Sequence, residues 1–410
     1  MYDRMSNEQI QNEMHVILHM GETYLNETPG GKRIRAFYDV LTEHGHHVKV
    51  MAPAYGKTGA AAKDVIYCPT VEMKKKTTLM RMLNQLSFAL SSVLYSAKAG
   101  KADIVLTSVP PALIAMAGWL IARLKGAKLV YDVRDIWPDV ALEIGGFSEG
   151  SFFCKIFAFV RDFLLKHADL VTTVSPGKVR KLKGHAPGAE ICFVPNGLDE
   201  RFLDNEFHPE TVEKYGLDAG FNCVYIGSFG RAQGLMQLMH LAERAKEKNL
   251  DARFVLFGNG VEEESLRRYA EDHQLDNVVF EHMIPNGEML TLLKAAQLSF
   301  VSLINEKLRD SVPTKMFEAL GVGCPVLLAA AGDAADLLNE CGLGIAVQPN
   351  HDDDLWNAFM ELYSNRDQYL QHCENARNVI LNRYSRQQAA VVLENHLERI
   401  IANGTRNTVG

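Results

Sequence analysis

Runs typical of strands and runs typical of helices alternate along the whole chain, and this alternation restricts the possible folds more than any other feature. In the first half, the alternating runs are 15–20, 33–43, 48–51, 103–107, 112–124, 129–132, 153–167 and 170–174. A second series follows residue 197, with runs at 223–227, 235–248, 254–258, 262–273, 278–280, 287–296 and 298–303. Strands that alternate with helices favour a parallel sheet covered by helices on both faces. We therefore expect an α/β protein with two doubly wound sheets.

The length of 410 residues allows two domains, each large enough to bury a core of its own. The two series meet near residue 197, so we place the first domain at 1–196 and the second at 197–385. The final amphipathic run, at about 386–402, is assigned to a separate terminal helix. Ligands of such sheets bind at the carboxyl ends of the parallel strands. Two domains that face each other would therefore enclose a binding cleft.

The composition is that of a cytoplasmic protein without bound metal. No stretch reaches the roughly 18 unbroken apolar residues that a membrane helix requires, and the polar N-terminus has no signal-peptide pattern. The seven cysteines are scattered without a Cys-x-x-Cys pair, so we expect them to be reduced. The fourteen histidines show no spacing such as His-Glu-x-x-His. Neither a metal nor another cofactor is expected.

Charge is distributed unevenly along the chain. Residues 1–200 hold 24 Lys/Arg and 20 Asp/Glu, whereas the rest holds 19 and 30, which gives net charges of +4 and −11. A basic first half suits an anionic membrane surface or an anionic acceptor, although plain drift in surface charge would give the same count. The basic run 74–76, the amphipathic run 78–98 and the aromatic run 152–159 fit either membrane docking or core burial. No nucleic-acid partner is expected.

The segment 310–328 carries the pattern that bears most directly on chemistry. Pro313 suits the first position of a helix, and Lys315 and Glu318 then lie three residues apart on one helical face. A helix N-terminus beside a lysine is suited to a diphosphate, and a carboxylate can accept hydrogen bonds from two vicinal hydroxyls. With Asp310 on the preceding loop, the segment is typical of a nucleotide-sugar pocket, or else of an ordinary helix–strand junction.

Two acidic residues eight positions apart, the second followed by Ala-x-Gly-x-Gly and then Pro-Val, resemble the donor-site signature of family 4 retaining glycosyltransferases. The resemblance extends through most of the chain and implies the GT-B fold, with two facing Rossmann-like domains, parallel sheets and an interdomain cleft. It also implies a terminal helix that crosses back onto the first domain. It assigns Glu318 to the donor ribose, Lys315 to the diphosphate, Thr314 to the nucleotide and Asp310 to the donor sugar. Asp310 departs from the glutamate that is usual there.

Loops after strand-like runs of the second half supply the other donor-side candidates. Arg231 lies on a glycine-rich loop that resembles the phosphate grip of the family, and a guanidinium suits bidentate phosphate binding. The usual lysine of that grip is absent near Gln233, so Lys315 is expected to supply the second cation. Gly258 and Ile284 follow successive strands, and the resemblance implies that they line the nucleotide. Each could otherwise belong to an ordinary turn.

A glycine pair follows the first strand-like run. Gly30 and Gly31 let the backbone approach a ligand closely, and a helix that opens just after them offers free N–H groups. Similar loops in the family face the donor phosphates and the acceptor. The resemblance therefore makes Gly30 and Gly31 donor-side candidates and Lys32 an acceptor-side candidate. Glycine pairs also occur in ordinary turns, which is the alternative.

The segment 131–139 follows a buried strand-like run, and its four charged residues are expected to leave the core at the edge of the cleft. It resembles the Arg-Asp-Leu-Trp-Pro segment of family members that act on lipid-linked acceptors. Arg134 stands where many members have a histidine near the sugar, so no general-base histidine is expected. Asp135 could orient an acceptor hydroxyl or could pair with Arg134.

The sequence thus indicates a retaining glycosyltransferase whose catalytic candidates are Asp310, Arg231, Lys315 and Asp135. The resemblance implies transfer of an N-acetylated amino or deoxyamino sugar from a UDP-sugar to a polyprenyl-diphosphate-linked saccharide. The reaction would build O-antigen, capsule or exopolysaccharide at the cytoplasmic face of a bacterial membrane. Cations aimed at the departing diphosphate would replace a divalent metal. Two alternatives remain, a UDP-sugar 2-epimerase of the same fold and a non-catalytic nucleotide-sugar-binding subunit.

Overall fold

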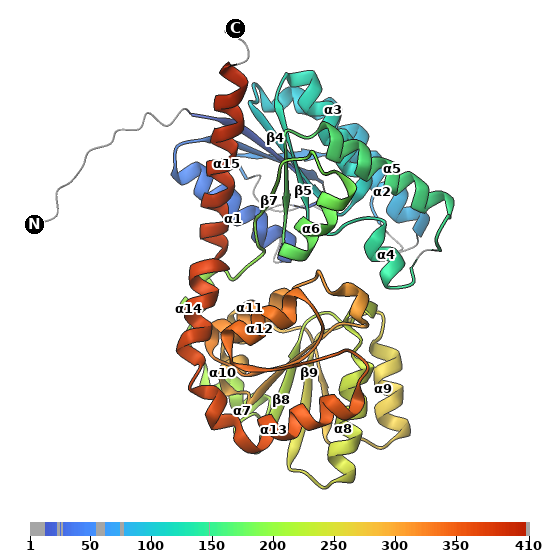
Figure 1. The fold of residues 1–410 in the computed structure, drawn as a ribbon, viewed down its shortest axis with the longest axis vertical. Coiled ribbons are helices and arrows are strands. Elements are labelled where there is room, and N and C mark those ends of the chain that lie inside the picture. The colour runs from blue at the N-terminus through green and yellow to red at the C-terminus, as the bar shows by residue number, and fades with distance from the viewer. Residues whose placement is uncertain are drawn as a thin grey trace, which may run out of the picture.

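The computed structural model describes residues 13–22, 25, 28–54, 62–73, 78–146 and 148–406. It contains two parallel sheets, each covered by helices, which lie one above the other along the long axis of the molecule (Figure 1). The two-domain α/β architecture predicted from the alternating runs is confirmed. Within these ranges, no helix is long and apolar enough to cross a membrane. The basic run 74–76 lies outside the described residues.

The first sheet has seven parallel strands in the order β3-β2-β1-β4-β5-β6-β7. Its strands are β1 (His15–His19), β2 (His47–Pro53), β3 (Val65–Cys68), β4 (Ile104–Val109), β5 (Lys128–Val133), β6 (Leu170–Thr173) and β7 (Ile191–Phe193). Its helices are α1 (Pro29–Glu43), α2 (Thr78–Tyr95), η1 (Ser96–Ala99), α3 (Ala112–Lys125), α4 (Asp139–Glu143), α5 (Phe152–His167) and α6 (Pro176–His185). Every residue of β4 is buried, as expected for a parallel strand with helices on both faces.

The second sheet has six parallel strands in the order β10-β9-β8-β11-β12-β13. Its strands are β8 (Phe221–Ile226), β9 (Ala252–Phe257), β10 (Val278–Glu281), β11 (Leu298–Ser302), β12 (Val326–Ala329) and β13 (Gly344–Val347). The helices that follow β7 are η2 (Glu200–Asp204), α7 (Pro209–Lys214), η3 (Arg231–Gln233), α8 (Met236–Glu247), α9 (Glu263–Asp272), α10 (Asn286–Ala295), η4 (Glu306–Leu308), α11 (Thr314–Val322), α12 (Asp333–Cys341), α13 (Asp352–Leu370), α14 (Cys373–Arg383) and α15 (Arg386–Arg406).

Both sheets reverse their strand order at the centre, between β1 and β4 in the first and between β8 and β11 in the second. Loops leave the sheet in opposite directions at such a point and open a crevice at the carboxyl ends of the strands. Contacts across the interface show that the two carboxyl edges face each other. Lys32, in the helix after β1, pairs with Glu318, and Lys178, in the helix after β6, pairs with Asp310 in the loop after β11.

The terminal helix α15 packs against α1 of the first domain (Figure 1). Its buried apolar residues include Leu393 and Leu397, which join Ile34 and Phe37 of α1 in one cluster. Buried Glu394 of α15 contacts the imidazoles of His44 and His46 at the far end of α1. The helix therefore completes one face of the first domain, although it follows the second domain in the sequence.

The chain crosses between the domains twice, and the two crossings lie side by side. The Leu198 amide donates to the Tyr384 carbonyl at 2.7 Å, and the Arg386 amide donates to the Leu198 carbonyl at 2.8 Å. Gly197 has φ +52°, and a Cβ at this position would overlap the Tyr384 carbonyl. A glycine is required here both for its backbone conformation and for the close approach.

Candidate active site

Helix α11 carries the two predicted donor-side residues on the side that faces away from its core contacts. Met316, Phe317 and Leu320 are buried in the second domain, whereas Lys315 and Glu318 are half-buried. The helix begins at Thr314, and Pro313 is its N-cap with φ −63° and ψ 131°. The sequence prediction that Pro313 occupies the first helical position was therefore wrong by one residue, because its extended ψ ends the preceding loop.

The ammonium of Lys315 is held by two side chains of the β8 region. Its Nζ lies 2.5 Å from the Tyr225 hydroxyl and 2.7 Å from Oε1 of Gln233, and it stands 3.8 Å from the centre of the Tyr225 ring. A Cβ on Gly227 would come within 3.1 Å of Nζ, so the glycine makes room for the ammonium. Gln233, which replaces the lysine usual in the family, thus accepts a hydrogen bond from Lys315.

Burial lowers the pKa of Lys315 to about 7, although the attraction of Glu318 opposes the shift. The group is therefore partly neutral near physiological pH when no anion is bound. A diphosphate beside it would favour the charged form. The charge of Lys315 would therefore depend on whether an anionic ligand is bound.

Glu318 lies where the two domains meet, and its carboxylate is half-buried. Oε1 of Glu318 is 4.0 Å from Nζ of Lys32, which projects from the first turn of α1. Burial raises the pKa of Glu318, and the positive charges of Lys32, Arg386 and Lys315 oppose that rise. The structure thereby brings together Lys32 and Glu318, predicted on opposite sides of the cleft, at one position.

Gly30 and Gly31 lie in the first turn of α1, which begins at Pro29, whereas the sequence predicted a helix that opens just after the glycine pair. The Gly31 amide donates to the N-cap hydroxyl of Thr28 at 3.0 Å. A Cβ on Gly30 would overlap the Glu22 carboxylate and the Arg134 guanidinium, so only glycine lets these groups approach the helix end. A carboxylate at a helix N-terminus occupies the position that suits an anion.

Arg134 pairs with Glu22, with Nη1 and Oε1 at 3.5 Å, and donates from Nη2 to the Pro110 carbonyl at 3.1 Å. Its ion pair is therefore with Glu22, whereas the sequence offered Asp135 as a partner. Within the described ranges, the buried Nε of Arg134 has no hydrogen-bond partner. Asp135 lies in the loop after β5, and its side chain is half-buried.

Asp132 does not leave the core, which corrects the expectation that all four charged residues of 131–139 do so. It is 1% exposed and accepts hydrogen bonds from Arg33, Ser108 and Thr172 at 2.8, 2.8 and 2.6 Å. Burial raises the pKa of Asp132, but the charge and hydrogen bonds of Arg33 outweigh it and hold the pKa below its usual value. Arg33 also donates to the Val194 carbonyl, which fixes the end of the first domain.

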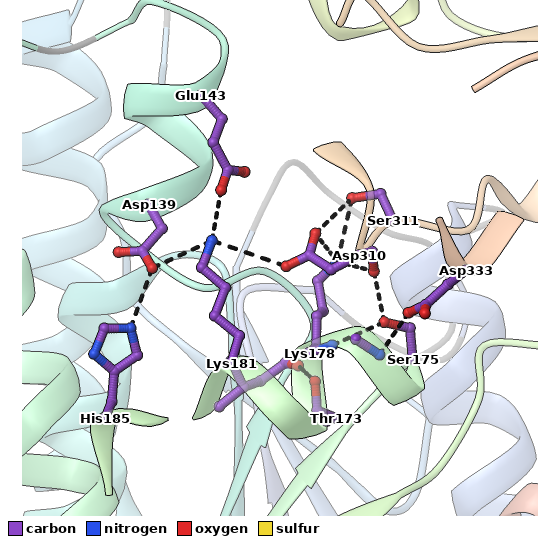
Figure 2. Close-up of polar contacts among 12 residues, drawn as sticks. Asp139, Glu143, Thr173, Ser175, Lys178, Lys181, His185, Asp310, Ser311 and Asp333 are labelled. Atoms are coloured by element: carbon purple, nitrogen blue, oxygen red, sulfur yellow. Dashed lines mark hydrogen bonds and ion pairs between the residues drawn. The ribbon is translucent and has the colours of Figure 1, made fainter. Parts of the chain in front are cut away.

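Asp310 is held by the first domain (Figure 2). Nζ of Lys178 donates to the Asp310 carbonyl at 2.9 Å and lies 3.4 Å from the Asp310 carboxylate, while the Ser175 hydroxyl donates to the same carbonyl at 2.5 Å. Lys178 is 3% exposed and Asp310 is 8% exposed. The acid predicted to face the donor sugar is therefore fixed in place by helix α6 of the other domain.

A second lysine of α6 extends this network. Lys181 contacts Glu143 and Asp139 of α4 at 2.5 and 3.3 Å, and it lies 3.9 Å from Asp310 (Figure 2). On the other side of α6, the Gly177 amide donates to the Asp333 carboxylate at 2.6 Å. We call the contacts of α4 and α6 with residues 305–311 and 333 the interdomain clasp.

Sequence reasoning missed the clasp. Lys178 and Lys181 lie in a basic run of a short helix, a pattern typical of any solvated surface. Asn305, whose amide donates to the Glu143 carbonyl at 2.9 Å, is equally inconspicuous. The one available signal was Ser175-Pro176, which marks a helix N-terminus directly after a strand and therefore at the cleft edge.

The remaining predicted residues lie at the same edge of the second sheet. Arg231 is exposed and its Nε is 3.5 Å from Glu262, so its contact in the structure is with this carboxylate. Gly258 follows β9, where a Cβ would overlap the Gly227 carbonyl. Ile284 follows β10 and is buried. Among the described residues, no three His, Cys, Asp or Glu side chains are grouped so that they could hold a metal ion.

Two protein-family models match this chain, one in each half. Residues 30–197 match the family described as glycosyl transferase 4-like domain, and residues 210–379 match the family described as glycosyl transferases group 1. The chain belongs to the family 4 glycosyltransferases. Both the family and the transferase activity predicted from the sequence are thereby confirmed.

Individual relatives and solved structures that resemble this glycosyltransferase include one curated protein and two solved structures. The WcaI protein of Escherichia coli K12, named for colanic acid biosynthesis, is 28% identical over 81% of this chain and 87% of its own length. The sucrose-phosphate synthase of Thermosynechococcus elongatus has a TM-score of 0.78 at 16% identity, covering 95% of this chain and 99% of its own. HepE of Anabaena, solved with UDP and glucose, has a TM-score of 0.71 at 16% identity, covering 94% and 100%. These solved structures confirm the predicted GT-B fold.

Proposed function

We propose that this glycosyltransferase moves an N-acetylated amino or deoxyamino sugar from a UDP-sugar to a polyprenyl-diphosphate-linked saccharide, with retention at the anomeric carbon. The reaction would serve surface polysaccharide synthesis at the inner face of a bacterial membrane. The name of WcaI supports the polysaccharide role, and the UDP and glucose in the HepE structure support a UDP-sugar donor.

The observation that carries the proposal is the meeting of α11 and α1 across the cleft. Lys315 and Glu318 lie on one side of α11, and Lys32 from the first turn of α1 approaches Glu318 to 4.0 Å. A cation beside a helix N-terminus suits a diphosphate, and a half-buried carboxylate suits the two hydroxyls of a ribose. Donor binding would therefore use both domains at once.

The proposed chemistry breaks the bond between the anomeric carbon and the diphosphate oxygen, and both electrons leave with UDP. The acceptor hydroxyl oxygen forms the new bond to the same carbon, and its proton passes to the departing phosphate. Lys315, with Arg231 if its side chain turns from Glu262, would stabilise the charge that develops on the diphosphate. Asp310 would contact the donor sugar and Asp135 the acceptor, with Thr314, Gly258 and Ile284 around the nucleotide.

A calorimetric titration with UDP in the presence of EDTA tests the donor site. We expect micromolar, UDP-selective and metal-independent binding, with GDP, ADP and CMP as controls. Glu318→Ala should weaken UDP binding at least about tenfold, because a lost charged hydrogen bond costs about 1.5–3 kcal/mol. Glu264→Ala, an exposed carboxylate on α9, is the matched control. Binding of another nucleotide instead would contradict the UDP assignment.

Turnover assays separate the proposal from its two alternatives. Sugar transfer to a polyprenyl-diphosphate-linked saccharide would support the transferase reaction proposed here. Conversion of the UDP-sugar to its 2-epimer without acceptor would instead select the epimerase. Tight UDP binding with neither reaction, across a panel of donors and lipid acceptors, would select the non-catalytic binding subunit.

A further inference from the structure

The first domain carries a concentration of exposed apolar side chains that its fold does not explain. Among the described residues, eighteen large hydrophobic side chains are exposed, and ten of them lie on only three helices. On α2 they are Met82, Leu83, Leu86, Leu90 and Leu94; on α3 they are Leu120 and Leu124; on α5 they are Phe152, Phe153 and Phe159. Exposed apolar groups that gather in one region mark an interaction surface, whereas scattered ones need no explanation.

These ten side chains belong to one face of the molecule. Leu83, Leu86, Leu90 and Leu94 follow each other at spacings of three and four, so they share one side of α2. Helix α2 packs beside α3, and α3 packs beside α5. The three helices cover the side of the first sheet opposite to α15 (Figure 1). We call this surface, with η1, the α2–α3–α5 face.

The α2–α3–α5 face is also strongly basic. Its four elements hold seven Lys and Arg and a single acid, Asp162, although the whole chain has a net charge of −7. The exposed basic residues are Arg81, Lys98, Arg123, Lys155 and Lys166. Arg161 faces inward and pairs with Asp139 at 2.7 Å. Positive charge is therefore concentrated on the face that also carries ten of the eighteen exposed large hydrophobic side chains among the described residues.

We propose that the α2–α3–α5 face docks onto the surface of an anionic lipid bilayer. Leucine and phenylalanine side chains would enter the boundary between headgroups and acyl chains, and the lysines and arginines around them would contact anionic headgroups. A second copy of the same chain is a poor occupant, because an isologous contact would place two basic faces against each other. An anionic bilayer accounts for both features of the face: its negative headgroups attract the basic residues, and its acyl chains accept the exposed apolar side chains.

The face leads toward the acceptor side of the cleft. A cavity of about 180 Å³ lies between the start of α2 and the loops after β1 and β4, and it is lined in part by Arg81, Gln85, Gly21 and Pro111. Gly21 adjoins Glu22, which pairs with Arg134. Docking by this face would bring a membrane-held acceptor to that cavity. This part of the inference rests on the proposed function, whereas the docking itself does not.

Vesicle flotation of the full chain without any nucleotide sugar tests the docking. We expect binding to vesicles of phosphatidylglycerol and phosphatidylethanolamine, little binding to phosphatidylcholine vesicles, and release by salt. The double variant Leu90→Glu, Leu94→Glu should bind at least about tenfold more weakly, because it removes apolar contact and adds repulsion. Leu94 is 76% exposed, and Val261 in the second domain is 73% exposed, so Val261→Glu is the matched control.

Two results would overturn the proposal. One is equal binding of the wild type to neutral and anionic vesicles, or binding to neither. The other is a double variant that binds as the wild type does, or that differs from it only by converting a dimer to a monomer in sedimentation. Far-UV circular dichroism and the thermal unfolding midpoint of the same variants show whether they are folded. Because flotation needs no donor or transfer, a failure of docking is distinguishable from a failure of the proposed reaction.

Discussion

At the scale of single residues, the site depends on how a few charges are compensated. Among the residues that the structure describes, no carboxylate is in contact with the ammonium of Lys315; its partners are the neutral Tyr225 and Gln233. Asp310, by contrast, has Lys178 beside it, and Arg134 has Glu22. Of these three charged groups, Lys315 is thus the one whose polar contacts in the described part of the chain are neutral.

This leads to a prediction for the pH dependence of UDP binding. Burial lowers the pKa of Lys315 to about 7 in the free protein, and a bound diphosphate would raise it. Binding then takes up a proton, so UDP affinity should fall by up to about tenfold per pH unit as the pH rises above 7. Calorimetry in buffers of different ionisation enthalpy would measure the proton uptake.

Lys315→Met provides the control for this pH dependence. It should bind UDP more weakly than the wild type near pH 7, and its affinity should change little between neutral and mildly alkaline pH. A wild-type affinity that stays constant over the same range would show that Lys315 does not change its charge on binding.

At the scale of elements, helix ends at the cleft follow from short local signals. Thr28 before Pro29 and Ser175 before Pro176 each mark a helix start after a strand, and both hydroxyls accept a hydrogen bond from the third residue on. Local signals of this kind could be predicted because they involve only neighbouring residues. The need for glycine at position 197 could not be predicted in this way. It arises because a Cβ there would overlap the carbonyl of Tyr384, which is almost two hundred residues away in the sequence.

Gly197→Ala should lower the free energy of unfolding more than Gly45→Ala does. At Gly45 the only cost is that of placing a residue with a side chain at a positive φ angle. Gly45 has φ +87° with open space around it, so Gly45→Ala should cost about 1 kcal/mol. Gly197→Ala adds the overlap with the Tyr384 carbonyl and should cost about 2–3 kcal/mol or more. Thermal unfolding midpoints measure the difference, and equal losses in the two variants would refute the role given to the paired crossings.

At the scale of the whole molecule, the interdomain clasp links the position of Asp310 to domain closure. The ammonium of Lys178 contacts the carbonyl and carboxylate of Asp310 and the Ser311 hydroxyl, all in the second domain. If α6 moved away, Asp310 would lose its main cationic partner. The site that we assign to the donor sugar is therefore complete only when the two domains are together.

Lys178→Met should lower kcat/KM for sugar transfer by about tenfold or more, because misplacing a substrate-positioning group has effects of that size. It should also raise the radius of gyration measured by small-angle scattering, since the clasp loses its central contact. Lys183→Met on the same helix removes only an exposed bond to Ala189 and is the control. If Lys178→Met leaves both kcat/KM for sugar transfer and the radius of gyration unchanged, the interdomain clasp has no role in positioning Asp310 for the reaction.

The sequence by itself determined the two α/β sheets, the family, and the place of Lys315 and Glu318 on one face of a short helix. These features rest on periodicity and on motifs of neighbouring residues, which are local. Tertiary structure decided which charges meet: Glu318 with Lys32, Arg134 with Glu22, and Asp310 with Lys178. It also kept Asp132 in the core, beside Arg33. Such pairings depend on how two sheets face each other, and no spacing along the chain records that orientation.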